Sequence, residues 1–329
     1  MGITMRDVAV RAGVSVATVS HVLNQTRFVT ESTRQKVLEV IDELGYRPDT
    51  IARSFKTGKK NIIGIIVPDI ANPVWAMIIE EIEAVLSNKG YRLIICNTKE
   101  TKERELEHVH SLTSGLVDGL IIASTLSEYE PLSAEIPDGF PVVFIDRFPK
   151  GCPHDLIISN DSAALYQGVE KLITVDGHSR IGFITGLMRI STSVERLNAY
   201  KKAMNDYGLP IEDNFIQPGN SLAKNSVLQV QKLLEQKCTA IVVSNNIMAD
   251  DVLFYLNDNG IHLGKDISIL GQSIEGQRDY NLRRMDLFVQ PIAEMGRAAG
   301  QQILDRLSEP DMPIRHIILN SSYFPSTCN

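Results

Sequence analysis

The side chains that could carry out catalysis are scattered through this sequence and form no known catalytic pattern. A glycine-rich phosphate loop, the zinc-protease motif HExxH and the serine motif GxSxG are all missing from it. His108 and His110 are the closest of the seven histidines, and two residues apart they do not share a helix face. No CxxC pair occurs among the four cysteines, Cys96, Cys152, Cys238 and Cys328. The sequence therefore predicts no catalytic residue, no metal site and no cofactor.

With catalysis excluded, binding of another molecule is the function to consider. The distribution of charged residues differs between the beginning of the chain and the rest. Residues 1–60 contain ten Lys and Arg against six Asp and Glu, whereas residues 61–329 contain 23 against 34. A polyanion is attracted to a basic surface and repelled by an acidic one. We therefore expect only the first 60 residues to meet a polyanion.

Those residues have the signals of three short helices. Thr4 is a good N-cap for a first helix, Gly13 permits a tight turn, and Ser15 can cap a second helix at once. In that second helix Val19, Val22 and Leu23 can pack inward while Ala17, Thr18 and His21 stay outside. A third helix carries Val37, Val40, Ile41 and Leu44 on one face and stops at Gly45. The pattern predicts a helix-turn-helix, and a plain small helical bundle is the alternative.

Beyond residue 61, apolar runs of strand length alternate with amphipathic segments of helix length. The runs are residues 62–67, 91–96, 119–123, 142–145, 181–185, 240–243 and 267–270. Such alternation predicts parallel α/β sheets. The loop 68–75 after the first run brings Asn72 and Trp75, the one tryptophan, to a strand end, where they could form a platform for a sugar.

Several motifs in the first 54 residues closely resemble the DNA-binding head of the LacI/GalR family of regulators. They are MRDVA at 5–9, AGVS at 12–15, ATVS at 17–20, LGYRP at 44–48 and IARS at 51–54. Residues 20–29 are most similar to the heads of purine and ribose repressors, because most members have Arg where His21 stands. The resemblance implies that the second helix enters the major groove of operator DNA. It assigns base contacts to Val16, Ala17, Thr18, His21 and Arg27, and phosphate contacts to Thr4, Ser15 and Asn24.

The resemblance also implies a hinge helix over residues 49–58 that forms when two copies meet on DNA. A segment this short is marginal as an isolated helix. Phe55 stands where the family usually has a leucine that opens the central base step, and Phe is an accepted wedge residue. Packing of Phe55 against the body is the alternative. The expected partners are double-stranded operator DNA, a second copy of the chain in a homodimer, and a small effector, whose sign of control the sequence leaves open.

Residues 61–329 resemble the periplasmic sugar-binding proteins, which implies a ligand cleft between two doubly wound parallel-sheet subdomains. The expected domains are the helix-turn-helix head (1–48), the hinge (49–60) and the sensor (61–329). Within the sensor, one subdomain takes residues 61–160 and 291–319, and the other takes 161–290 and 320–329. The family's ligand positions fall on Asn72, Trp75, Asn97, Arg147, Arg196, Asn246, Ser273 and Gln290.

Two of these residues change the chemistry of the expected cleft. Asn246 and Ser273 stand where the family commonly supplies aspartates, while Arg147 and Arg196 remain. Because buried arginines need an anionic partner, we expect an acidic effector, such as a sugar acid or a sugar phosphate, in place of a neutral sugar. The alternative is that Asp146, Asp250 or another carboxylate of the chain pairs with them.

Two further functions compete with a regulator. A transport receptor would use the sensor but leaves the head without a role, and a purely architectural DNA binder would use only the head. The N-terminus has neither a basic region nor an apolar core of a signal peptide, and no apolar stretch is long enough to span a membrane. We therefore expect a cytoplasmic protein that does not contact a membrane.

Overall fold

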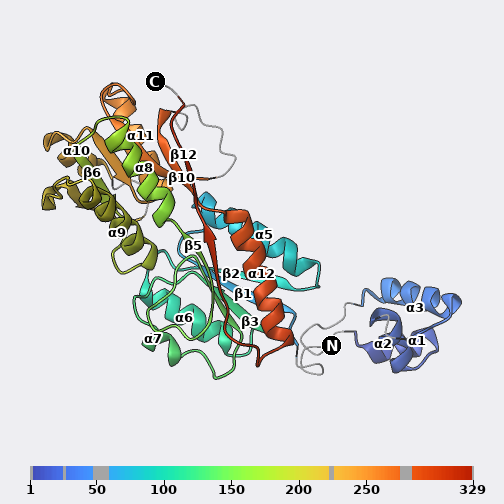
Figure 1. Cartoon of the computed structure of the whole chain (residues 1–329). Coiled ribbons are helices and arrows are strands. Elements are labelled where there is room, and N and C mark those ends of the chain that lie inside the picture. Colours follow the sequence, from blue (N-terminus) through green and yellow to red (C-terminus); the bar gives the residue numbers. More distant parts are fainter. Residues whose placement is uncertain (1–2, 25–26, 47–58, 222–225, 275–283, 328–329) are drawn as a thin grey trace. The chain divides into compact units, whose positions relative to one another are not determined.

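The computed structural model describes residues 3–24, 27–46, 59–221, 226–274 and 284–327 (Figure 1). The chain divides into two compact units, Met1–Lys60 and Asn61–Asn329. The predicted hinge segment 49–58, with Phe55, lies outside the described residues.

The first unit contains the three predicted helices, α1 (Met5–Ala12), α2 (Val16–Asn24) and α3 (Glu31–Leu44). Thr4 caps α1 through a reciprocal capping box with Asp7. The Ser15 hydroxyl accepts a hydrogen bond from the backbone N–H of Thr18, at 3.0 Å, and so caps α2. Gly13 adopts the left-handed conformation at φ 65°, and this lets the chain turn between the two helices. The helix-turn-helix prediction is confirmed.

A small apolar core holds these helices together. It contains Val8, Ala9, Ala12, Val19, Val22, Val37, Val40 and Tyr46. Val19 and Val22 are 0% and 3% exposed, as predicted for the inward face of α2. Burial of this face leaves the opposite face of α2 turned away from the core.

The second unit contains two six-stranded sheets. The first sheet has the order β11-β5-β4-β3-β1-β2, and its strands are β1 (Ile62–Val67), β2 (Arg92–Asn97), β3 (Gly119–Ile122), β4 (Val142–Ile145), β5 (Asp155–Asn160) and β11 (His316–Asn320). The second sheet has the order β12-β10-β9-β8-β6-β7, and its strands are β6 (Ile181–Thr185), β7 (Ile216–Pro218), β8 (Ala240–Val243), β9 (Ser268–Ser273), β10 (Asp286–Val289) and β12 (Ser322–Phe324). Every pair of named strands is parallel except β10 and β12.

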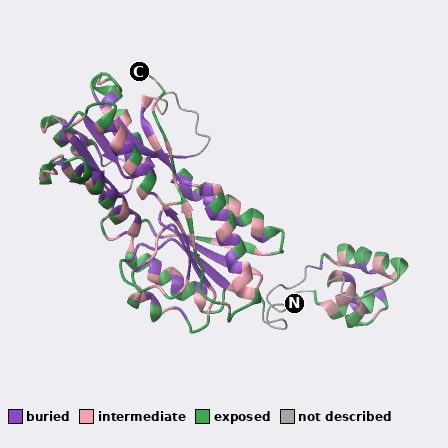
Figure 2. Ribbon diagram, viewed as in Figure 1, coloured by how far each residue is buried: buried purple, intermediate pink, exposed green. Residues whose placement is uncertain are grey.

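Helices cover these sheets, and Figure 2 shows the interior strands largely buried, whereas β2, β11 and β12 are intermediate or exposed. The helices are α5 (Pro73–Ser87), α6 (Lys102–Thr113), α7 (Glu130–Ser133), α8 (Ser162–Thr174), α9 (Ser191–Asp206), the 3-10 turn η1 (Asp213–Phe215), α10 (Val227–Glu235), α11 (Asn246–Asp258) and α12 (Ile292–Ser308). Helices α5 and α12 lie side by side in Figure 1. Gly296 permits this contact, since a Cβ atom there would lie 2.9 Å from the carbonyl oxygen of Ile78. The predicted fold of a helical head and two parallel-sheet subdomains is confirmed.

The chain passes between the two sheets three times. It leaves the first sheet after β5 (ending at Asn160), returns after β10 (ending at Val289), and leaves again after β11 (ending at Asn320). Each crossing follows the carboxyl end of a strand. The carboxyl ends of both sheets therefore meet at one place, which we call the inter-sheet junction.

The His154 ring lies in an apolar contact just before β5. Its centroid is 5.9 Å from that of Phe144 and 5.3 Å from that of Tyr129, whose hydroxyl is 2.6 Å from Nε2. Burial lowers the pKa of His154 to about 4, and the positive charge of Arg306 adds to this while Asp155 opposes it. The neutral ring is therefore the form that the fold accommodates.

This pKa predicts a pH-dependent loss of stability. Between pH 6.5 and 4 the unfolded chain binds a proton at His154 that the folded chain does not, so stability falls as the pH is lowered through this range. The free energy of unfolding should drop by about 2 to 3 kcal/mol more in the wild type than in His154→Gln between pH 7 and 4.5. Urea unfolding followed by the fluorescence of Trp75 measures it. Equal losses in the two proteins would contradict the burial argument.

Candidate functional site

The outward face of α2 carries the side chains that the sequence assigned to base contacts. Val16 is 44% exposed, Ala17 is exposed, and Thr18 and His21 are half-buried. Arg27, after the helix, is exposed as well. Thr4 and Ser15, the predicted phosphate ligands, use their hydroxyls as helix caps. The side chain of Asn24 lies outside the described residues.

One residue of this region received no role from the sequence. Phe28 follows Arg27 directly and is 93% exposed, the highest value among the large apolar side chains of the described residues. An apolar ring held in solvent beside a basic residue can contact a thymine methyl group or a base step. Its position in the sequence between two helices gave no indication of this exposure.

At the inter-sheet junction the structure brings together predicted ligand residues from both subdomains. Asn72, before α5, and Asn246, at the start of α11, form two reciprocal amide hydrogen bonds of 3.3 and 2.9 Å. Gln290 donates to Asp146 at 2.7 Å and to Ser159 at 2.5 Å, and it accepts from Gln272 at 2.6 Å. Asn97 and Ser273 lie at the carboxyl ends of β2 and β9. The two walls of the junction therefore contact each other directly.

Arg147, after β4, is paired within its own subdomain. Its Nη1 donates to Glu100 at 2.7 Å, and its Nε lies 3.6 Å from the Asp146 carboxylate. Burial disfavours the charged guanidinium, but Glu100 and Asp146 outweigh that effect and raise the pKa of Arg147. Burial also raises the pKa of Asp146, since the attraction of Arg147 and Arg196 offsets only part of the desolvation.

The Trp75 ring packs against the guanidinium of Arg147. The guanidinium carbon of Arg147 lies 5.6 Å from the centroid of the Trp75 ring, a cation–π contact. The indole is only 2% exposed and belongs to the apolar core of the first subdomain. The structure therefore places Trp75 beneath Arg147, where it is not the open platform for a sugar that the sequence suggested.

Arg196, on α9, is held at the crossing between the sheets. Its Nε and Nη2 donate to the Asp161 carboxylate at 2.7 and 2.5 Å, and its Nη1 donates to the carbonyl oxygen of Ser244 at 2.6 Å. Asp161 follows β5 and is fully buried. Its other oxygen accepts from the Ser321 hydroxyl at 2.5 Å, so one carboxylate joins two of the three crossings.

These pairs remove the premise of the acidic-effector hypothesis. The hypothesis required arginines without an anionic partner, yet Glu100 neutralises Arg147 and Asp161 neutralises Arg196. The structure instead has the alternative arrangement, in which carboxylates of the chain itself pair with both arginines. Of the carboxylates named beforehand, Asp146 takes part at 3.6 Å, whereas Glu100 and Asp161 were not recognised from the sequence.

A third arginine, also not recognised, bridges the junction. Arg189, before α9 of the second subdomain, donates to the carbonyl oxygens of Thr125 at 3.1 Å and Glu100 at 2.7 Å in the first. The buried Glu105 carboxylate orients Thr125 by accepting from its N–H and hydroxyl, both at 2.6 Å. Burial raises the pKa of Glu105 even though these hydrogen bonds oppose it. Arg189 therefore acts as a clasp between the subdomains.

Unsatisfied polar atoms mark the same place. Seven buried side-chain atoms of the described residues have no hydrogen-bond partner, and five of these belong to Thr98, Glu100, Arg147, Thr185 and Ser244. Each of the five residues stands at or just after the carboxyl end of β2, β4, β6 or β8. Native proteins rarely leave buried polar atoms unpaired, so their concentration indicates a ligand or water site.

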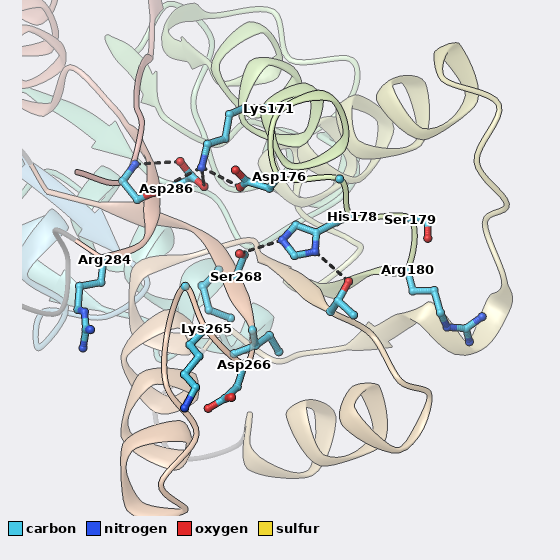
Figure 3. A pocket seen from close by; sticks show the side chains of 16 residues that line it. Lys171, Asp176, His178, Ser179, Arg180, Lys265, Asp266, Ser268, Arg284 and Asp286 are labelled. Atoms are coloured by element: carbon cyan, nitrogen blue, oxygen red, sulfur yellow. Dashed lines mark hydrogen bonds and ion pairs between the residues drawn. The ribbon is translucent and has the colours of Figure 1, made fainter. Parts of the chain in front are cut away.

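A separate depression of about 530 Å³ opens at the amino ends of the second sheet (Figure 3). His178 lies there between the hydroxyls of Thr239 and Ser268, each 2.9 Å away, and Lys171 lies between Asp176 and Asp286. These polar groups satisfy one another. The depression also lies at the opposite ends of the strands from the junction, so we do not assign it to the predicted ligand.

Neither a metal cluster nor a membrane span is found among the residues that the structure describes. No group of three or more His, Cys, Asp or Glu side chains there could hold a metal ion. None of the helices there is long and apolar enough to cross a bilayer.

Comparison with known proteins matches each of the two units to a family model. Residues 4–49 match the family described as bacterial regulatory proteins, lacI family, and residues 60–315 match the periplasmic binding proteins and sugar binding domain of LacI family. The HTH-type transcriptional repressor PurR of Vibrio atlanticus (strain LGP32) is 33% identical over 94% of this chain and 93% of its own. Such relatives are transcriptional repressors and not enzymes.

Solved structures have the same fold. The lac repressor dimer bound to operator and the anti-inducer ONPF superimposes with a TM-score of 0.86 over 100% of both chains, at 24% identity. A LacI family transcriptional regulator from Enterococcus faecium with bound ribose superimposes with a TM-score of 0.70 over 80% of this chain and 96% of its own, at 22% identity.

The clasp predicts that Arg189→Ala loosens the junction. Two hydrogen bonds from a charged donor are lost, so the subdomains should separate more often, and the distance between dyes at exposed Glu103 and Asn205 should lengthen. Energy transfer in the full-length protein measures this distance.

Arg180→Ala is the matched control, because that guanidinium donates to the carbonyl oxygen of Gln236 within one subdomain. It should leave the dye distance unchanged. An Arg189→Ala protein with the wild-type distance would show that the clasp does not hold the subdomains together.

Proposed function

The chain belongs to the LacI family of bacterial regulatory proteins, and from this premise we propose that it represses transcription as a cytoplasmic homodimer bound to a two-part operator. Two heads related by two-fold symmetry fit a pseudo-palindromic duplex. The lac repressor to which it is similar is a dimer bound to operator. The observation that carries the proposal is the two-sided character of α2: one face is buried in the core of the head, and the opposite face is exposed. The unit that contains this helix is basic.

The proposed DNA contacts fall into three classes. Base edges are read by Val16, Ala17, Thr18, His21 and Arg27; phosphates are bound by Thr4, Ser15 and Asn24; and Phe55 opens the central step. A helix N-terminus attracts phosphate, so backbone N–H groups beside the capped ends of α1 and α2 support the second class. Arg27 has the fork geometry that suits guanine.

The proposed effector site is the inter-sheet junction, built from Asn72, Trp75, Asn97, Arg147, Arg196, Asn246, Ser273 and Gln290. The relative from Enterococcus faecium holds ribose. Among the classes expected from the sequence, sugar, sugar acid and sugar phosphate, the internal pairing of both arginines favours the uncharged sugar.

The proposed control follows from the contacts across the junction. Effector binding replaces direct contacts such as Asn72–Asn246, shifts the subdomains, and thereby changes whether two hinge segments assemble on DNA. We propose the boundaries 1–48 for the head, 49–60 for the hinge and 61–329 for the sensor. One subdomain takes 61–160 and 291–319, and the other takes 161–290 and 320–329.

Selection from a random duplex pool tests the head. The wild type should enrich one pseudo-palindromic sequence, and the logarithm of its affinity should fall steeply with the logarithm of salt concentration, because several phosphates are neutralised. Arg27→Ala should bind the enriched sequence about 5- to 100-fold more weakly and lose preference at one position of each half-site.

The matched control is Arg11→Ala. It also removes one positive charge from the head, but the guanidinium that it removes is already paired with Glu43 at 2.5 Å. It should keep the wild-type base preference. Enrichment of no sequence, or an unchanged preference in Arg27→Ala, would refute the proposed reading of bases.

A further inference from the structure

We propose that Glu100 is a specificity residue of the sensor, whose free carboxylate oxygen accepts a hydrogen bond from a hydroxyl or amino group of the effector and rejects acids. This inference rests on the proposed function, because it concerns the same junction. Glu100 belongs to none of the positions that the family resemblance assigned to ligand.

The two oxygens of this carboxylate are in different situations. Oε1 accepts from Arg147 at 2.7 Å, while Oε2 is buried without a hydrogen-bond partner. The side chain is only 5% exposed, so bulk water does not satisfy the second oxygen. A buried carboxylate oxygen left unpaired costs more than a neutral group would. A donor supplied by a bound molecule removes that cost.

The backbone around Glu100 is held in a strained conformation. Lys99 and Glu100 adopt left-handed φ values of 50° and 57°, in a region that non-glycine residues rarely occupy. Lys99 is fixed by an ion pair with Asp69, and the Glu100 carbonyl oxygen is fixed by Arg189. Strain of this kind persists where the surroundings position a residue for a function. Neutralising Arg147 alone would not require a constraint from both subdomains.

The other unpaired atoms at the carboxyl ends of the strands suit a ligand that both donates and accepts. Thr98, Thr185 and Ser244 each present a buried hydroxyl without a partner, and a hydroxyl can act in either sense. Arg147 adds the unpaired Nε–H, whose charge is already balanced. Hydroxyl groups of a sugar or the amino group of an amino sugar match this set. A carboxylate or phosphate placed here would face the Glu100 oxygen and be repelled.

The first arm of the test uses the wild-type protein and matched probes. Calorimetry compares D-glucose, D-galactose and D-glucosamine with D-glucuronate and D-galacturonate, and D-ribose with ribose 5-phosphate. At least one neutral or amino probe should bind, and about 10-fold or more tightly than its acidic counterpart. Tighter binding of an acid or phosphate, as would follow if Arg189 received the anion, overturns the inference. So does binding of no neutral or amino probe.

The second arm uses Glu100→Gln, with Glu103→Gln as the control at an exposed position of α6. Glu100→Gln should lower the affinity for the best neutral probe about 10- to 100-fold without lowering the affinity for its acidic counterpart. The ratio of the two affinities should therefore approach one. Glu103→Gln should keep the wild-type ratio. An unchanged ratio in Glu100→Gln would assign this residue a structural role only. Operator affinity, measured on the same preparations, reports separately on the proposed function.

Discussion

The sensor depends on one geometric constraint: the chain crosses between its sheets three times, always beyond the carboxyl end of a strand. Asp161 secures this arrangement, because its buried carboxylate binds Arg196 of the second subdomain and Ser321 of the third crossing. Removing one member of such a pair leaves an uncompensated buried charge, at a cost of about 3–5 kcal/mol. Strand ends from both sheets therefore stay opposed, and side chains far apart in sequence meet at a single junction.

Charge pairing then determines what this junction can bind. Arg147 and Arg196 contribute charge that Glu100 and Asp161 already balance, so their role is to orient neighbouring groups. Two kinds of contact link the walls: the neutral amide pair Asn72–Asn246, and the Arg189 clasp, in which a charged guanidinium donates to uncharged carbonyl oxygens. The neutral hydrogen bonds between Asn72 and Asn246 can be exchanged for hydrogen bonds to a ligand's hydroxyl groups at little net cost. A small polar molecule can thus shift the balance between the subdomains.

Local rules were sufficient for the head and for part of each sheet of the sensor. Thr4, Gly13 and Gly45 act where their backbone chemistry predicts, and β1, β3, β4, β6 and β8 follow the apolar runs. The interior strands β5 and β10 and the edge strands β7, β11 and β12 were not predicted, because none of them contains more than three consecutive apolar residues. The site was only partly predictable. Glu100, Asp161 and Arg189 gain their roles from partners 35 to 89 residues away, which no local pattern reveals.

The central claim is that a molecule bound at the junction and a duplex bound by the heads influence each other through one conformational equilibrium. Coupling of this kind is reciprocal, so the most direct measurement is the affinity of the tightest neutral sugar with and without the selected duplex. The account predicts a change of about fivefold or more, equal to the factor by which that sugar changes duplex affinity. Identical sugar affinities in the two conditions would contradict it.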